Sequence, residues 1–218
     1  MPFPLIPLAV GAVALVSGAV VAGAKTRDAL VAKKLAATRV AILGRQHVGK
    51  TALLTTLQKP SVTNALPASA SPLGGQFELE VDGHLVPFTV PRDLPGGAGL
   101  GYGHWKTAFD GSGSVWYLFR ADRVAAGDHD ELAAIKSDVD VLASWLTGGH
   151  HPSVMLIGTW ADADPDWMRH PRAFARRVAS VDAIKVALVK LRGAKLVIGS
   201  LSTIDDAERL RREIRRNH

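Results

Sequence analysis

The stretch AILGRQHVGKTALLTTL, Ala41 to Leu57, constrains the fold more than any other part of this chain. An apolar run, Val40 to Leu43, ends at a glycine, as a buried strand ends at a turn. Residues Lys50 to Leu57 have the pattern of a helix. Between them, Gly44 to Thr51 match G-x-x-x-x-G-K-T, whose glycines let backbone N–H groups point at phosphate oxygens. The stretch therefore predicts a strand, a phosphate-binding loop and a helix in direct succession.

The residues of this loop have separate tasks in phosphate binding. Lys50 carries the ammonium that reaches the β- and γ-phosphates, and Thr51 carries a hydroxyl that ligates Mg²⁺. The positive end of the following helix adds to the attraction. The candidate binding residues of the segment are Gly44, Arg45, Gln46, His47, Val48, Gly49, Lys50, Thr51 and Ala52. A glycine turn that binds no ligand is the alternative hypothesis.

The rest of the chain alternates strand-like and helix-like segments. QFELEVDGHLVPFTV predicts a hairpin around Asp82-Gly83, a favoured turn pair. Long loops are expected at 59–75 and in RDLPGGAGLGYGHW, after the hairpin. Further strands are expected at Ser114–Phe119, Ser153–Gly158 and Ala194–Gly199. Helices are expected at Asp130–Leu146 and Asp205–Arg216, and helical material, either broken or continuous, at Pro171–Leu191. This order predicts a three-layer α/β fold with a mostly parallel six-stranded sheet, in which the hairpin supplies an antiparallel edge.

The first segment of the chain is long and apolar. Pro2 to Ala24 contain no charged residue, and as a helix they span about 35 Å, enough for a hydrocarbon core of about 30 Å. Mostly basic residues follow, which by the positive-inside rule places this flank in the cytoplasm. We expect a single-pass transmembrane helix at 1–24, a helical neck at 25–38 and one globular domain at 39–218. The alternative is a cleaved signal peptide, because Ala22-Gly23-Ala24 resembles a cleavage site.

Composition excludes several function classes. The chain has no cysteine, which excludes a disulfide framework, a cysteine–zinc site and thiol catalysis. The eight histidines have no metal-ligating spacing, so no structural metal is expected. A net charge of +6 is compatible with nucleic acid, anionic lipid or a phosphate ligand, and we expect no nucleic-acid partner. Arginines of the last helix provide either a lipid-facing surface or a solvated helix end: Arg209, Arg211, Arg212, Arg215 and Arg216.

Three more motifs lie at informative places. Asp93-Leu94-Pro95-Gly96 follows the hairpin, Thr159-Trp160-Ala161-Asp162 follows the strand SVMLIG, and GSLST, Gly199 to Thr203, follows the last strand. Together with Gly44 to Thr51, they make residues 40–201 resemble small GTPases of the Ras-like and Arf-like kind. An anchor in front of such a domain is similar in architecture to the β-subunit of the signal recognition particle receptor.

The resemblance implies which residues bind Mg²⁺ and the γ-phosphate. Asp93 is expected to hold Mg²⁺ through water, and the Gly96 N–H to contact the γ-phosphate. The loop at 59–75 is expected to supply a third metal-binding residue, for which Ser69 is favoured together with Ser71, and Thr63 is the other candidate. The position after Asp93-Leu94-Pro95-Gly96, where many family members carry Gln or His, holds Gly97. The candidate catalytic residues are therefore Lys50, Gly96 and His104.

The resemblance also implies how the base is chosen. Asp162 is expected to accept two N–H donors from one edge of guanine, a pair that adenine does not offer. Thr159 and Trp160 are expected at the same subsite, where Trp160 replaces a family lysine by stacking on the base. Ser200 and Leu201 are expected to lie against the guanine. The alternative is that Asp162 or Asp164 only caps the next helix.

These expectations define one main functional hypothesis and two rivals. The main hypothesis is a membrane-anchored switch on the cytoplasmic side that binds GTP or GDP with Mg²⁺. Since Gly97 cannot position water, hydrolysis is expected to be slow or to need a protein partner, either an effector or an activating protein. One rival is a scaffold that binds GTP without hydrolysing it. The other is an ATP-using enzyme or transporter component, although the chain lacks a transporter-ATPase signature and the usual second ATPase motif.

Overall fold

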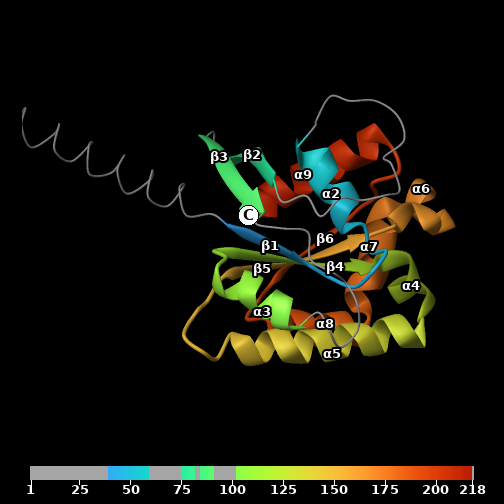
Figure 1. The fold of residues 1–218 in the computed structure, drawn as a ribbon. Coiled ribbons are helices and arrows are strands. Elements are labelled where there is room, and N and C mark those ends of the chain that lie inside the picture. The colour runs from blue at the N-terminus through green and yellow to red at the C-terminus, as the bar shows by residue number, and fades with distance from the viewer. Residues whose placement is uncertain (1–38, 59–74, 82–83, 91–101, 218) are drawn as a thin grey trace, which may run out of the picture. The chain divides into compact units, whose positions relative to one another are not determined.

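A four-stranded parallel sheet lies at the centre of the structure, a computed structural model that describes residues 39–58, 75–81, 84–90 and 102–217 (Figure 1). Its strands, in spatial order, are β1 (Val40–Leu43), β4 (Ser114–Arg120), β5 (Ser153–Thr159) and β6 (Lys195–Ile198). The central strand β4 pairs Ser114 with Val40 of β1 and with Ser153 of β5. The predicted α/β class with a mostly parallel sheet is therefore confirmed.

These segments form strands because they are apolar along their whole length. All four residues of β1 are buried, and β4 is buried from Ser114 to Phe119. A strand buried on both faces belongs in a parallel sheet that helices cover on each side. Because the strands are parallel, the segments that follow β1, β5 and β6 emerge at the same edge of the sheet, and there they form the candidate site.

The prediction of one six-stranded sheet is wrong. The main sheet has four strands, and β2 (Gly75–Val81) and β3 (His84–Val90) form a separate antiparallel pair. A single parallel bridge, from Arg39 to Thr89, connects that hairpin to the chain entering β1. Aromatic side chains also fix the hairpin, because Phe77 and Phe88 stack at 5.3 Å and both approach Trp116 of β4.

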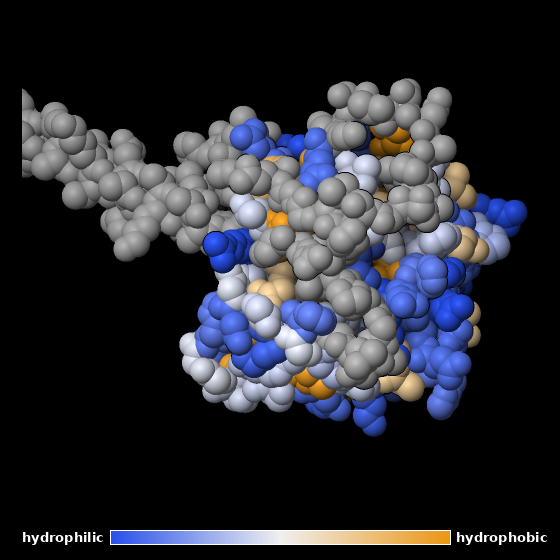
Figure 2. Space-filling model, viewed as in Figure 1, coloured by the Kyte–Doolittle hydropathy of each residue, from blue (hydrophilic) through white to orange (hydrophobic). Residues whose placement is uncertain are grey.

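Helices cover both faces of the sheet, as Figure 1 shows. Helices α2 (Lys50–Gln58) and α9 (Ile204–Asn217) lie on one side, and α3 (Tyr102–Asp110), α5 (His129–Trp145) and α8 (Asp182–Lys190) lie on the other. The remaining helices of the described ranges are α4 (Ala121–Ala126), the short 3₁₀ helix η1 (Ala161–Ala163), α6 (Pro165–Arg169) and α7 (Pro171–Ser180). On the face that Figure 2 shows, hydrophilic residues dominate the described surface.

One segment differs from its predicted secondary structure, and in another the structure decides between two predicted alternatives. The end of the glycine-dense stretch, predicted as loop, begins α3, which forms because Trp105 and Phe109 bury one side of it a turn apart. The stretch Pro171–Leu191 contains two helices, because Val181 has an extended backbone between them. No proline marks the break at Val181.

The last helix, α9, carries its arginines on a salt-bridged outer side. Ala207, Leu210 and Ile214 form its buried stripe. Ion pairs on the helix join Arg209 to Asp206, Arg212 to Glu208 and Arg216 to Glu213, while Arg211 donates to the Glu78 carbonyl of β2. The lipid-facing surface and the solvated helix end both stay predictions.

The membrane prediction falls on residues outside the described ranges. Within those ranges, no helix is both long enough and apolar enough to cross a bilayer. The expected anchor at 1–24 and neck at 25–38 stay predictions.

Candidate functional site

The loop between β1 and α2 has the backbone that its glycines predict. Gly44 and Gly49 have φ values of 140° and 85°, and His47 has a φ of 59°. A Cβ on Gly44 would lie 2.5 Å from the Leu118 carbonyl oxygen of β4, so only glycine fits there. Gln46 and His47 are exposed, whereas Val48 is buried. The residues of the sequence motif thus form a tight loop that packs against β4.

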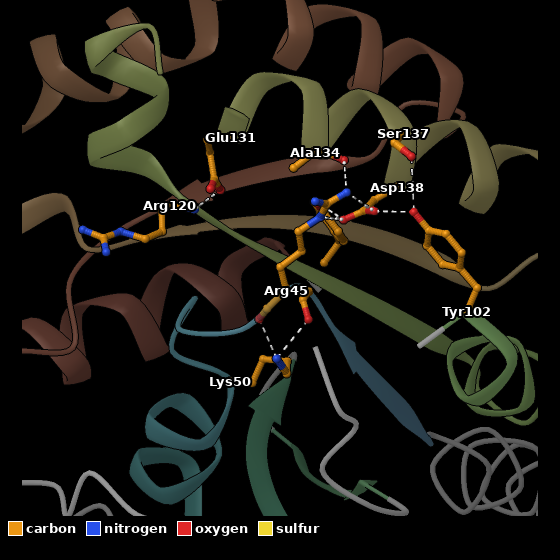
Figure 3. Close-up of polar contacts among 10 residues, drawn as sticks. Arg45, Lys50, Tyr102, Arg120, Glu131, Ala134, Ser137 and Asp138 are labelled. Carbon is orange, nitrogen blue, oxygen red and sulfur yellow. Dashed lines mark hydrogen bonds and ion pairs between the residues drawn. The ribbon is translucent and has the colours of Figure 1, made fainter. Parts of the chain in front are cut away.

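Lys50 is folded back across this loop. Its ammonium donates to the carbonyl oxygens of Gly44 at 2.9 Å and Arg45 at 2.7 Å, and its side chain is buried (Figure 3). The first helical bond of α2, from Leu53 N to Gly49 O, begins directly at the loop. A buried cation and a helix N-terminus therefore meet at one loop, the combination that attracts phosphate. Thr51 and Ala52, in the first turn of α2, are half-buried.

Two contacts connect the segment after β5 to the phosphate loop. The Thr159 hydroxyl donates to the Val48 carbonyl oxygen at 2.7 Å and lies 3.1 Å from that of Phe119. The indole Nε1 of Trp160 donates to the His47 carbonyl oxygen at 2.9 Å. These residues are 111 and 113 positions apart in sequence. The candidate base segment and the candidate phosphate segment therefore form one continuous surface.

Asp162 presents a carboxylate beside this surface. It lies in η1, half-buried, and within the described part of the chain no group donates a hydrogen bond to it. Asp164, by contrast, accepts from the Asp166 N–H and caps α6. The capping alternative therefore applies to Asp164, and Asp162 is the cap of neither η1 nor α6.

The segment after β6 completes the candidate site. Ala161 N donates to Gly199 O at 3.2 Å, which joins this segment to the one after β5. Ser200 is fully buried, and its hydroxyl accepts from Ser202 N at 3.0 Å. Leu201 approaches the phosphate loop, since a Cβ on Gly49 would lie 3.4 Å from its Cδ1. Three predicted segments thus meet at the carboxyl edge of the sheet.

Arg45, the second loop residue, points away from the base segment toward α5. Its Nε and Nη2 each lie 3.1 Å from a carboxylate oxygen of Asp138, which is buried (Figure 3). The same carboxylate accepts from the phenols of Tyr102 in α3 at 2.7 Å and Tyr117 in β4 at 2.9 Å. The hydrogen bond to Asp138 raises the pKa of Arg45, and burial first and the Asp138 charge second raise the pKa of Tyr117.

Sequence reasoning missed this cluster around Asp138. One signal was available, because Asp138 falls among Ile135, Val139 and Leu142 on the apolar side of the predicted helix. An acid on such a side needs buried donors. Nothing in the sequence alone indicates that the donors come from the phosphate loop, β4 and α3.

Several predicted site residues lie outside the described ranges. These are Asp93, Gly96 and Ser69, so among the three predicted Mg²⁺-binding residues the structure describes Thr51 alone. His104 is exposed on α3. Within the described residues, no group of three or more acidic or histidine side chains is arranged to hold a metal ion. Bound to a nucleotide, Mg²⁺ takes oxygens from the phosphates as well, so the loop with Thr51 remains compatible with it.

A hollow of about 790 Å³ lies beside β6, between α7 and α9. Leu188, Leu196, Ile198 and Leu210 contribute its apolar surface, with Arg172 and Arg176 beside them. None of the predicted nucleotide-binding residues lines this hollow. Gly199, whose carbonyl accepts from Ala161 N, also lines the hollow, so the hollow borders the candidate site.

Comparison with models of known protein families and with curated proteins finds no match to this chain. The functional interpretation therefore depends on the residues and their geometry.

Proposed function

We propose that this chain is a guanine-nucleotide-binding protein with a Ras-like phosphate-loop fold. It binds GTP or GDP with Mg²⁺ and acts as a nucleotide-dependent switch. It is held at the cytoplasmic face of a membrane by the helix expected at 1–24. It hydrolyses GTP slowly or with the help of a partner protein.

One observation carries the proposal: Thr159 and Trp160 are hydrogen-bonded to carbonyls of the phosphate loop, at Val48 and His47. A nucleotide needs its base and its phosphates bound at a fixed separation. A direct connection between the two candidate subsites supplies that separation without requiring the ligand to order it.

The fold arrangement adds support. The order β1-β4-β5-β6, with the hairpin next to the chain entering β1, leaves the phosphate loop and the base segment at the same edge. Open α/β sheets bind ligands beyond the carboxyl ends of their strands. Asp162 supports guanine in particular, because its carboxylate is half-buried and receives no hydrogen bond from the described residues.

Nucleotide titration of the full chain in detergent tests the proposal. We expect GDP and GTP to bind in preference to ATP, and Lys50→Ala to weaken both by at least about tenfold, since a charge-assisted phosphate contact is lost. Asp162→Asn is expected to move the preference from guanine to xanthine nucleotides. The matched control is Asp166→Asn, an exposed acid a few residues further along. Equal affinity for ATP and GTP in the unmodified chain would refute the guanine assignment.

Turnover separates the switch from the non-hydrolysing scaffold. The purified chain, alone and with membrane extract, is incubated with GTP and phosphate release is followed. Release that Lys50→Ala abolishes supports a GTPase. Stable GTP binding without release under both conditions supports the scaffold.

A further inference from the structure

Trp160 is held in a conformation that is unfavourable for its residue type. Its φ of 58° lies in the left-handed region, where the Cβ of a bulky residue crowds the backbone at a cost in free energy. The residue is 41% exposed, so burial does not compensate for that cost. The indole is nevertheless fixed along one edge, by the hydrogen bond to His47 O. Strained residues that persist on a surface are typical of binding sites.

Arg120 fixes the same indole from one face. It is the last residue of β4, and its guanidinium carbon lies 4.5 Å from the centre of the Trp160 ring. A cation over the face of tryptophan is attracted by the ring quadrupole. The contact places the guanidinium over one face of the indole and restricts the rotation of the ring.

Arg120 is itself anchored, by Asp122 in α4. The Arg120 Nε and Nη2 contact the two carboxylate oxygens of Asp122 at 3.0 and 2.5 Å. The Arg120 backbone N–H donates to Glu131 at the start of α5 (Figure 3). The hydrogen bond to Asp122 raises the pKa of Arg120, so the guanidinium stays charged. A continuous series of contacts thus runs from Asp122 through Arg120 and Trp160 to the phosphate loop.

We propose that Arg120, anchored by Asp122, is a positioning residue that holds Trp160 as the stacking platform for a purine base. The inference rests on the proposed function and extends it to two residues outside every motif of the resemblance. Its energetic reason is pre-organisation. A tryptophan already oriented in the free protein loses less rotational freedom when the base stacks on it.

The test compares a ligand that has a base with one that lacks it. Affinities for GDP and for inorganic tripolyphosphate are measured on the full chain and on Arg120→Ala. Because an indole that is free to rotate keeps only part of its stacking on the base, the loss of orientation is expected to weaken GDP binding about five- to tenfold. Tripolyphosphate affinity is expected to stay the same, because the phosphate loop is untouched. Arg123→Ala, which removes a neighbouring exposed arginine, is the matched control and is expected to change neither.

Two further measurements separate positioning from general structural damage. Asp122→Ala leaves Arg120 in place but frees it, and it is expected to reproduce the GDP-specific loss. Arg120→Lys keeps the charge without the planar group and is expected to recover only part of the affinity. In the nucleotide-free protein, acrylamide is expected to quench tryptophan fluorescence more strongly in Arg120→Ala, and a Trp160→Phe background is expected to abolish that difference.

The outcomes distinguish the two proposals. Unchanged GDP affinity in Arg120→Ala and Asp122→Ala, with normal binding by the unmodified chain, overturns the positioning role alone. Equal weakening of GDP and tripolyphosphate also overturns it, because the effect then lies in the phosphate loop. Binding of tripolyphosphate but not of GDP by the unmodified chain overturns the proposed function and the positioning role together.

Discussion

Arg45 and Asp138 form a two-point ion pair across 93 residues of sequence, with Nε and Nη2 of the guanidinium each 3.1 Å from the carboxylate. Arg45 belongs to the phosphate loop and Asp138 to the buried side of α5. The same carboxylate accepts a hydrogen bond from Tyr102, which is the first residue of α3. The carboxylate therefore links the phosphate loop to the helix that follows residues 91–101, where the resemblance places the γ-phosphate contact.

Removal of the Asp138 carboxylate is expected to destabilise the protein strongly. Asp138→Ala leaves the buried Tyr117 phenol without its acceptor and Arg45 without its partner, at a cost of about 3 kcal/mol. The measurement is the free energy of unfolding by urea. Asp140→Ala, on the same helix but in an exposed ion pair with Lys190, is expected to change it by less than about 1 kcal/mol. Equal effects of the two variants would contradict the central role of Asp138.

The two tyrosines of the chain provide a direct pH test, since both donate to Asp138. Burial is the first cause that raises the pKa of each above 10.0. The folded state therefore favours the neutral phenols. This stabilisation is present below pH 10 and is lost as the pH rises through the raised pKa values that the two tyrosines have in the folded protein. We expect less tyrosinate absorbance in the native protein than in urea-denatured protein just above pH 10. Identical titration curves would refute the buried cluster.

The folded state is expected to favour the protonated form of Glu131, whereas an ordinary acid in an ion pair is favoured in its ionised form. Burial is the main cause that raises its pKa above 4.5, although its carboxylate accepts from Arg120 N. The folded state therefore favours the protonated acid, so stability is lost as the pH rises through that value. Glu131→Gln keeps the acceptor and is expected to gain less than about 1 kcal/mol at pH 7, with no gain below pH 4. Glu208→Gln, on the exposed side of α9, is the control and is expected to show no comparable gain. A loss of stability at pH 7 in Glu131→Gln would contradict the conclusion that the cost of burying the charge exceeds the gain from the hydrogen bond with Arg120 N.

Two glycines are expected to respond oppositely to alanine. Gly44→Ala places a Cβ 2.5 Å from a backbone carbonyl at a positive φ, and about 1–3 kcal/mol of stability is expected to be lost together with nucleotide binding. Gly103→Ala meets nothing within 4 Å on α3, and a gain of up to about 1 kcal/mol is expected. Thermal unfolding and GDP titration measure both variants. A Gly44→Ala protein that retains full stability and binding would contradict the close packing of the loop on β4.

Much of the candidate site was predictable because its residues follow strands. An apolar run that ends in glycine or threonine identifies a strand end, and the carboxyl ends of parallel strands meet at one edge. Gly44 to Thr51, Thr159, Trp160, Ser200 and Leu201 lie where that argument places them. The assignment of Asp93, Gly96 and Ser69 stays a prediction, because these residues lie outside the described ranges.

The sequence by itself determined the α/β class and the succession of strand, glycine-bounded loop and helix from Val40 to Gln58, because local spacing and apolar runs encode them. Tertiary structure alone decided the rest. It separated the hairpin from the main sheet, and within the described residues one bridge, from Arg39 to Thr89, connects the two. It also placed Arg45 on Asp138 and Arg120 on Trp160. Contacts between residues so far apart depend on how the layers pack, and no local pattern of residue types records that.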